Sequence, residues 1–240
     1  MIHGFLLMLD FANFRLLTFD CYGTLIDWEA GIFSVLQPML AAHEKHISDS
    51  ALLELYGELE AEAEAEEYSS YRSVLQCVVR GVGQRLGFDP SEAEARALPE
   101  SIAKWRPFPD TVEALHRLAK GYKLAILSNI DDDLFAWTAP KLGVAFDHVI
   151  TAQQARCYKP CLKLFQMAEE RCGVARSAWL HVGQSIYHDV IPAQSLGIAT
   201  VWVNRKSARP GVGAVRPAAG RPDLEVPDLA TLAALAVPGA

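Results

Sequence analysis

The chain has 240 residues and a net charge of −7, with 51% hydrophobic and 21% charged residues. This length allows one sizeable core, with or without an inserted domain, and the composition is that of an ordinary globular protein. A negative charge without a Lys/Arg-rich run argues against nucleic acid or anionic membrane as a partner. No apolar stretch approaches the roughly 18 residues that a membrane span needs. The five cysteines are odd in number and form no CxxC pair, so we expect reduced thiols in the cytoplasm.

The start of the chain is apolar over residues 1–9. It lacks the basic region and the small-residue cleavage site of a signal peptide, so we expect no secretion signal. Met8 is a second candidate for the initiator, beside Met1, and would make the first seven residues an upstream extension.

Short β-type runs follow one another along the chain, separated by stretches with helical apolar spacing. The predicted strands are 16–19, 122–127, 146–150, 179–182, 200–203 and, as a short edge strand, 224–226. The predicted helices between them are 110–120, 131–142, 161–172 and 189–196. Strands that alternate with such helices predict an α/β fold with a parallel sheet and right-handed crossovers.

Residues 30–105 interrupt this alternation, because they hold no convincing strand. Their pattern predicts helices at 30–44, 50–67, 69–86 and 91–104. We therefore expect a helical cap domain, 28–105, inserted into a core made of 1–27 and 106–240.

Two stretches are interpreted from their composition. Residues 54–67 hold seven glutamates and no basic residue, which predicts a solvated outer helix face rather than a cation site. Beyond Asn204 the chain is rich in Pro, Gly and Ala to about residue 222, which predicts a mobile surface loop.

Asp20 is the leading candidate for a chemical role. It follows the apolar run 16–19 and opens Asp20-Cys21-Tyr22-Gly23-Thr24-Leu25. Open α/β sheets place their chemistry at the carboxyl ends of central strands, and Gly23 permits a sharp turn there. A lone Asp-x-x-Gly is more often a helix cap or a turn, so the assignment depends on matching strand ends further along.

Three such motifs lie beside later predicted strand ends, namely Ser128-Asn129, Lys159-Pro160 and Gly183 to Asp189. Together with Asp20-x-x-Gly23-Thr24, this ordered set resembles the haloacid dehalogenase superfamily over nearly the whole chain. Asp-x-Tyr-Gly-Thr-Leu is similar to its 2-haloacid dehalogenase (type II) branch. The resemblance implies a Rossmann-like core with a helical cap, and an aspartyl-enzyme intermediate.

The resemblance also implies roles for the matching residues. Asp20 becomes the nucleophile, Lys159 its counter-charge and Asp189 the acid of the fourth motif, which positions water. This agrees with the chemistry of a carboxylate, a weak nucleophile that works when it is positioned, desolvated and held ionised by a nearby cation. The predicted catalytic residues are Asp20, Thr24, Ser128, Lys159 and Asp189, and the predicted substrate-binding residues are Tyr22, Arg72, Asn129, Gln184 and Ser185. For Lys159 the alternative is an ordinary surface lysine.

The site departs from the superfamily's magnesium phosphatases at two positions. Those enzymes carry a second aspartate two residues after the nucleophile, where this chain has Tyr22, and a Gly-Asp pair in the fourth motif, where it has Gly183-Gln184. Because Gln184 is neutral, the site lacks a charge that Mg²⁺ would want. A halide leaves without a metal or an acid, so we expect no metal and no cofactor.

The chain also departs from the 2-haloacid dehalogenases. That branch has a cap-domain arginine near the halide, whereas no Lys or Arg lies between Lys45 and Arg72 here. Arg72 is a candidate substitute, with a surface role as the alternative, and Phe165 stands where the branch has a tyrosine. His181, within a predicted strand, is expected to be a satisfied core histidine. Tyr187 and His188 are candidates for lining the site.

The first hypothesis is therefore a metal-independent hydrolase of the 2-haloacid dehalogenase type, acting through Asp20. The expected partner is a small-molecule substrate, a small organic acid, and a homodimer is left open. The alternatives are a Mg²⁺-dependent small-molecule phosphatase and a non-catalytic binding module on the same fold.

Overall fold

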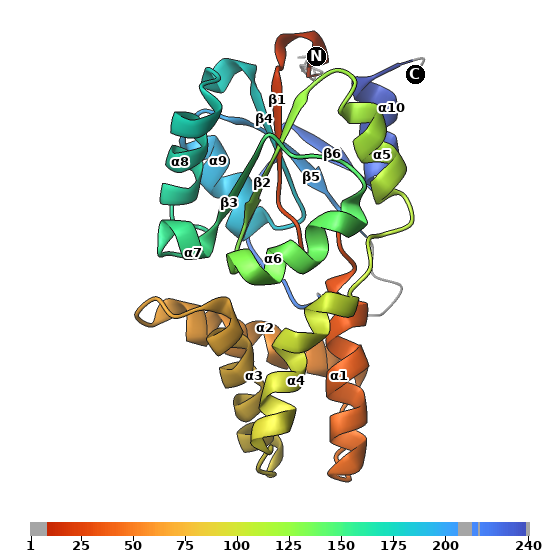
Figure 1. The fold of residues 1–240 in the computed structure, drawn as a ribbon, viewed down its shortest axis with the longest axis vertical. Coiled ribbons are helices and arrows are strands. Elements are labelled where there is room, and N and C mark those ends of the chain that lie inside the picture. Colours follow the sequence, from red (N-terminus) through yellow and green to blue (C-terminus); the bar gives the residue numbers. More distant parts are fainter. Residues whose placement is uncertain (1–8, 206–212, 216, 239–240) are drawn as a thin grey trace, which may run out of the picture.

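A computed structural model describes residues 9–205, 213–215 and 217–238. Met8, the alternative start, lies outside the described residues. The centre of the molecule is a six-stranded parallel sheet in the order β3-β2-β1-β4-β5-β6 (Figure 1). Its strands are β1 (Leu16–Phe19), β2 (Lys123–Ser128), β3 (His148–Thr151), β4 (Trp179–Gly183), β5 (Ala199–Val203) and β6 (Leu224–Val226).

The central strand β1 lies between β2 and β4. Every residue of β1 is at most 1% exposed, as expected for a parallel strand that is covered on both faces. All six predicted strands are present, and the largest shift is in β3, which begins two residues later than the predicted 146–150. The continuous apolar runs of the core strands are what made them recognisable in the sequence.

Helices cover both faces of this sheet (Figure 1). One side carries α5 (Thr111–Leu118) and α10 (Leu229–Ala236), and the other carries α7 (Ala152–Ala155), α8 (Lys163–Cys172) and α9 (Ile191–Ser195). A further helix, α6 (Asp132–Thr138), follows β2. The sequence pattern did not predict α10, because Leu-Ala-Thr-Leu-Ala-Ala-Leu-Ala is apolar nearly all round and has no polar face.

A helical insertion separates β1 from α5. It comprises α1 (Trp28–Ala42), α2 (Asp49–Ala65), α3 (Tyr71–Leu86) and α4 (Glu92–Ser101), with a 3₁₀ turn at Ile102–Lys104. Ser48, Ser70 and Ser91 begin α2, α3 and α4 by accepting a backbone N–H in the first turn. Figure 1 shows the insertion beyond the carboxyl-terminal edge of the sheet. The predicted α/β class with inserted helices is confirmed, while the domain limits at 28 and 105 stay a prediction.

The segment after Asn204 packs more closely than its composition predicted, as far as it is described. Ala214 is 3% exposed, and its carbonyl oxygen would lie only 2.6 Å from a Cβ atom added at Gly57 of α2. Residues 213–215 therefore pack against the insertion, and the prediction of a mobile surface loop is wrong for them. Residues 206–212 and 216 lie outside the described residues.

No helix in the described part of the chain is long and apolar enough to cross a membrane.

Candidate active site

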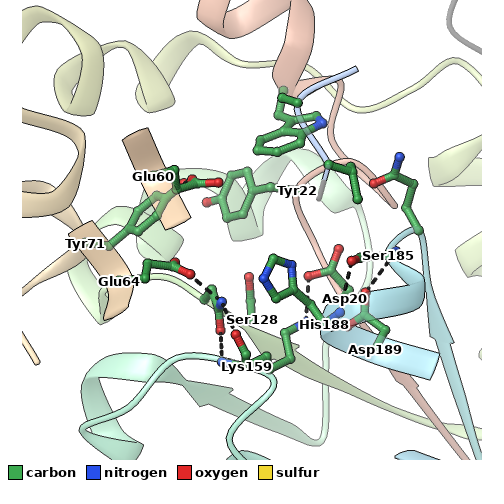
Figure 2. Close-up of a pocket in the computed structure, with 15 residues that line it drawn as sticks. Asp20, Tyr22, Glu60, Glu64, Tyr71, Ser128, Lys159, Ser185, His188 and Asp189 are labelled. Carbon is green, nitrogen blue, oxygen red and sulfur yellow. Dashed lines mark hydrogen bonds and ion pairs between the residues drawn. The ribbon is translucent and has the colours of Figure 1, made fainter. Parts of the chain in front are cut away.

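Most of the predicted site residues come together at the carboxyl-terminal edge of the sheet, facing the helical insertion (Figure 2). Asp20 follows β1, Ser128 ends β2, and Gln184 and Ser185 follow β4. Lys159 arrives from the loop between α7 and α8. Because the carboxyl ends of parallel strands meet at one edge, side chains far apart in the sequence share one pocket.

Lys159 joins the two aspartates of the site. Its Nζ lies 2.9 Å from Asp20 Oδ1 and 2.6 Å from Asp189 Oδ1, and it donates a third hydrogen bond to the Leu127 carbonyl oxygen at 3.1 Å. Lys159 is only 2% exposed. All three ammonium hydrogens thus have an acceptor, and the alternative of an ordinary surface lysine is wrong.

The pKa values of the two aspartates shift in opposite directions. Burial raises the pKa of Asp20, more than the Lys159 charge lowers it. Burial also acts to raise the pKa of Asp189, but the Lys159 charge and the hydrogen bond from His181 outweigh it and hold that pKa well below its usual range. For Lys159, burial is outweighed by the two carboxylates, which raise the pKa of its ammonium. Asp189 is therefore the firmly ionised partner, while Asp20 keeps the less stabilised carboxylate.

Thr24 and Gly23 orient the Asp20 carboxylate. Thr24 Oγ1 donates to Asp20 Oδ2 at 2.8 Å and accepts the backbone N–H of Gln184 at 2.9 Å. Gly23 has a φ of 92°, and a Cβ there would lie 2.9 Å from Gln184 Oε1 and 3.0 Å from Trp28 Nε1. Both the backbone conformation and the lack of space require glycine at this turn.

Asn129 positions Lys159 through its backbone. Asn129 Oδ1 accepts the N–H of Lys159 at 2.7 Å, and Nδ2 donates to the Lys159 carbonyl oxygen at 3.3 Å. Asn129, which was predicted to bind substrate, thus connects the end of β2 to the loop that carries Lys159.

Behind Asp189 lies a chain of buried hydrogen bonds. Trp179 Nε1 donates to Thr18 Oγ1 at 2.7 Å, and Thr18 Oγ1 lies 2.8 Å from His181 Nδ1. His181 Nε2 lies 3.2 Å from Asp189 Oδ1. Since the carboxylate can only accept, Nε2 carries the hydrogen, and Nδ1 accepts from the Thr18 hydroxyl. His181 is a satisfied core residue, as predicted, and in addition it supports Asp189.

Two glutamates of α2 form the wall of the pocket on the side of the insertion (Figure 2). Glu60 is buried, and its Oε1 accepts the hydroxyl groups of Tyr56 at 2.9 Å and Tyr71 at 2.6 Å. Glu64, one turn further along the helix, is half-buried and lies 3.5 Å from Asn129 Nδ2. The prediction of a solvated outer face is wrong for this pair.

Burial raises the pKa of Glu60 to about 7, against the hydrogen bonds from Tyr71 and Tyr56 that lower it. Burial also raises the pKa of Glu64 well above its usual value, and the charge of Glu60 adds to that rise. The charge of Lys159 lowers the pKa of Glu64 in part. The two acidic groups nevertheless form no ion pair with a basic side chain among the described residues.

The described pocket contains most of the predicted site residues. Those that line it are Asp20, Tyr22, Ser128, Asn129, Lys159, Gln184, Ser185 and Asp189, and His188 also lines it. Thr24 does not line the pocket, but its hydroxyl group donates a hydrogen bond to Asp20. The structure adds Trp28, Glu60, Glu64 and Tyr71 from the insertion and Ala214 and Val215 from the later segment.

Arg72 is not among the residues that line this pocket. Its Nη2 lies 2.6 Å from Asp133 Oδ2, and its guanidinium carbon lies 5.5 Å from the centre of the Trp137 ring. The start of α3 is oriented this way because Asp131 accepts the backbone N–H groups of Tyr71 and Arg72. The structure therefore directs Arg72 toward α6 and away from the lining of this pocket.

The residues present do not fit a resident Mg²⁺ ion. Asp20 Oδ1 and Asp189 Oδ1 both face Lys159 Nζ, and the neutral Gln184 offers no third anionic oxygen. No cluster of three or more His, Cys, Asp or Glu side chains suited to a metal occurs among the described residues. Mg²⁺ demands near-ideal octahedral oxygen geometry, so a site with this donor set would bind it poorly.

Comparison with known proteins agrees with this geometry. Residues 14–197 match the family described as haloacid dehalogenase-like hydrolase. (S)-2-haloacid dehalogenase H-109 of Pseudomonas putida is 29% identical over 207 residues, covering 80% of this chain and 86% of that protein. Haloacetate dehalogenase H-2 of Moraxella sp. (strain B) is 28% identical over 195 residues, covering 79% of this chain and 85% of that protein.

Among solved structures, the L-2-haloacid dehalogenase from Xanthobacter autotrophicus with covalently bound chloropropionic acid has a similar fold. Its TM-score is 0.78 at 23% identity, over 95% of this chain and 100% of that chain.

Proposed function

Because the chain belongs to the haloacid dehalogenase-like hydrolases, we propose that it hydrolyses a carbon–halogen bond through an ester on Asp20, without a metal ion. The observation that carries this proposal is the buried arrangement in which Lys159 bridges Asp20 and Asp189. The relatedness to (S)-2-haloacid and haloacetate dehalogenases supports it.

In the first step a carboxylate oxygen of Asp20 bonds to the carbon that bears the halogen. The carbon–halogen bond breaks, and the halide leaves with the bonding electrons and needs no proton. Thr24 and Lys159 hold the carboxylate in position through hydrogen bonds of 2.8 and 2.9 Å. Because the carboxylate is already oriented toward its reaction partner, less entropy is lost when it attacks the carbon that bears the halogen.

In the second step water attacks the carbonyl carbon of the Asp20 ester. The bond from that carbon to the substrate oxygen breaks, which releases an alcohol, restores the carboxylate and frees one proton overall. Asp189 would orient this water; its ionised state and its link to Asp20 through Lys159 support that role.

Phosphoryl transfer is less well supported, because it needs a cation on the transferred group and an acid for the leaving oxygen. Tyr22 stands where the phosphatases have that acid, and its hydroxyl lies 2.9 Å from Thr138 Oγ1. Burial raises the pKa of Tyr22 well above its usual value, which makes it a still weaker acid near neutral pH.

The experiment is a screen of halogenated compounds and phosphate esters, with and without Mg²⁺, on wild type, Asp20→Asn and the control Asp89→Asn. Asp89 is exposed. We expect halide release that Asp20→Asn abolishes and Asp89→Asn leaves unchanged, with a covalent adduct on Asp20 in mass spectra. In a single turnover in ¹⁸O water, the label should enter Asp20 before the product.

Other outcomes separate the alternatives. An adduct on another residue would overturn the mechanism, and Mg²⁺-dependent phosphate release would favour the phosphatase. Ligand binding unaffected by Asp20→Asn, together with no turnover on the panel, would favour a binding module.

A further inference from the structure

We infer that this pocket recognises a positively charged amino group on its substrate, which Glu60 and Glu64 hold among the rings of Tyr22, Trp28 and Tyr71. The inference rests on the proposed function, because it names the substrate class of the same site. The substrate would then be an amine that carries a leaving group, instead of a simple halogenated acid.

The balance of charge in the pocket favours a cation. Its lining carries four acidic side chains, those of Asp20, Asp189, Glu60 and Glu64, against the ammonium of Lys159. Burial raises the pKa values of both glutamates, and a bound ammonium would favour their ionised form. Lys159 is already bonded to both aspartates. Glu60 and Glu64 on the opposite wall therefore form no ion pair with a basic side chain among the described residues, and an ammonium ligand would supply one.

The hydrogen bonds around Glu60 leave one side of its carboxylate for a ligand. Both tyrosine hydroxyls, of Tyr56 and Tyr71, donate to Oε1. The described residues direct no hydrogen bond to Oε2, and Glu60 lines the pocket. The two tyrosines hold the carboxylate in one orientation, so it is prepared to accept from an ammonium without a loss of side-chain entropy on binding.

Aromatic rings complete the wall. Tyr22, Trp28 and Tyr71 all line the pocket, and Trp28 is itself held edge-to-face against Tyr56 at 5.8 Å between ring centres. Ammonium groups are attracted to the faces of tyrosine and tryptophan rings, and aromatic residues beside carboxylates are a common arrangement for binding them.

A serine hydroxyl points to a polar ligand independently of the glutamates. Ser128 is 1% exposed, and its Oγ has no hydrogen-bond partner among the described residues. In the view of Figure 2 its side chain stands between those of Glu64 and Asp20. A buried hydroxyl without a partner costs free energy, which a ligand with a polar group near the nucleophile would recover.

The lining of the pocket holds no substitute for the cap-domain arginine that the 2-haloacid dehalogenases have near the halide. Arg72 is engaged by Asp133 outside the pocket. A carboxylate held against this wall would be repelled by Glu60 and Glu64 once they are ionised. The cavity has about 50 Å³ of room, enough for a few water-sized groups, so the amine would be a small one.

The test compares three ligands of similar size on the whole protein: propylammonium, its neutral analogue 1-propanol, and propionate. None has a leaving group, so the measurement does not depend on turnover. Dissociation constants are measured by NMR titration or calorimetry near neutral pH for wild type, Glu64→Gln, Glu60→Gln and the control Glu54→Gln. Glu54 lies on α2 like the other two, but it is exposed.

We expect propylammonium to bind at least about tenfold more tightly than propanol or propionate. Glu64→Gln and Glu60→Gln should each weaken propylammonium by about tenfold, whereas Glu54→Gln should change it by less than about twofold. Near-ultraviolet circular dichroism checks that both pocket variants are folded. If Glu60→Gln fails to fold, Glu64→Gln alone decides, because Glu64 makes only the long contact with Asn129.

Propionate binding at least as tightly as propylammonium would overturn the inference, as would Glu64→Gln with unchanged affinity. This outcome is distinct from a failure of the proposed function. The inference fails in ligand binding, whereas the function fails in covalent capture on Asp20.

Discussion

The side-chain amide of Asn129 holds both backbone polar groups of Lys159, accepting its N–H at 2.7 Å and donating to its carbonyl oxygen at 3.3 Å. The lysine ammonium reaches Asp20 and Asp189 only from this anchored position. Orientation of the charged centre therefore depends on a residue whose own side chain makes no bond to either aspartate.

Asn129→Ala should lower turnover by about 10- to 100-fold, because the loss of two positioning hydrogen bonds lets Lys159 move from the aspartates. Asn129→Asp, which keeps the Oδ1 acceptor, should retain more of the activity than Asn129→Ala. The control is Asn204→Ala, which removes an amide that bonds Glu225 at the far edge of the sheet. Steady-state kinetics measure the effect, and unchanged turnover in Asn129→Ala would contradict it.

Lys159→Ala should lower turnover by about 10²- to 10³-fold, since two buried carboxylates would lose their shared cation. Because the Lys159 charge lowers the pKa of Asp20, its removal should also move the acid limb of the pH–rate profile to higher pH. Lys159→Arg should restore activity only in part, because the larger planar guanidinium does not fit a fully buried ammonium site. The matched control is Lys163→Ala on the exposed face of α8. Activity of Lys159→Ala within about twofold of wild type would show that the lysine is merely structural.

Most of the fold and the core side of the site could be predicted from local patterns. The strand before Asp20 is buried on both faces, so its sequence is continuously apolar, and a parallel sheet then brings the later strand ends beside it. Asp20 and Ser128 could thus be placed together from their positions at strand ends, whereas Lys159 and Asp189 were grouped with them through the family resemblance. Arg72 was misplaced because a residue on a helix of the insertion can face several ways, and Asp131 and Asp133 decide which.

The glutamate wall could not be predicted, because the seven glutamates of 54–67 look alike in the sequence. Only the packing of α2 over the sheet edge separates buried Glu60 from exposed Glu62, which is paired with Arg85 on the outside. His181 gave a related difficulty. A histidine inside a strand indicates a satisfied core residue, but its bond to Asp189 depends on the turn after β4.

Chelation of metal should not reduce activity on the true substrate. The reason is that Lys159 already occupies the carboxylate oxygens of Asp20 and Asp189, while Gln184 offers no charge to Mg²⁺. Assays with EDTA and with added Mg²⁺ check this. Gln184→Asp supplies the missing anionic ligand, so it should raise Mg²⁺ affinity in calorimetry. Loss of activity in EDTA that Mg²⁺ restores in wild type would contradict the metal-independent mechanism.

His181→Leu should lower turnover by about tenfold, because Asp189 loses the donor on Nε2 that helps to keep it ionised and oriented. The variant should also lose about 1–3 kcal/mol of stability, since it leaves the buried Thr18 hydroxyl without its acceptor. Thr18→Val is the comparison, because it removes the contact with His181, together with the acceptor of Trp179 Nε1, and keeps the His181–Asp189 bond. Both variants should unfold at lower temperature, but only His181→Leu should change turnover. Equal losses of turnover in His181→Leu and Thr18→Val would show that His181 acts only through packing.

Glu60 should make the protein less stable as the pH rises toward neutrality. Its pKa is raised from 4.5 to about 7 in the folded state, chiefly by burial, so between these values the native state binds more protons than the unfolded state. The free energy of unfolding then falls with increasing pH. The stabilisation is fully present below about pH 4.5 and is lost as the pH passes through about 7. A pKa rise of this size corresponds to a change of roughly 3 kcal/mol in the free energy of unfolding.

Glu60→Gln keeps the Oε1 acceptor for Tyr56 and Tyr71 but cannot ionise. Denaturant unfolding across this range should therefore show a smaller fall for Glu60→Gln than for wild type, with the variant the more stable one above about pH 7. The exposed control Glu54→Gln should follow the wild-type curve, and a Glu60→Gln curve parallel to wild type would mean that Glu60 titrates at an ordinary pKa.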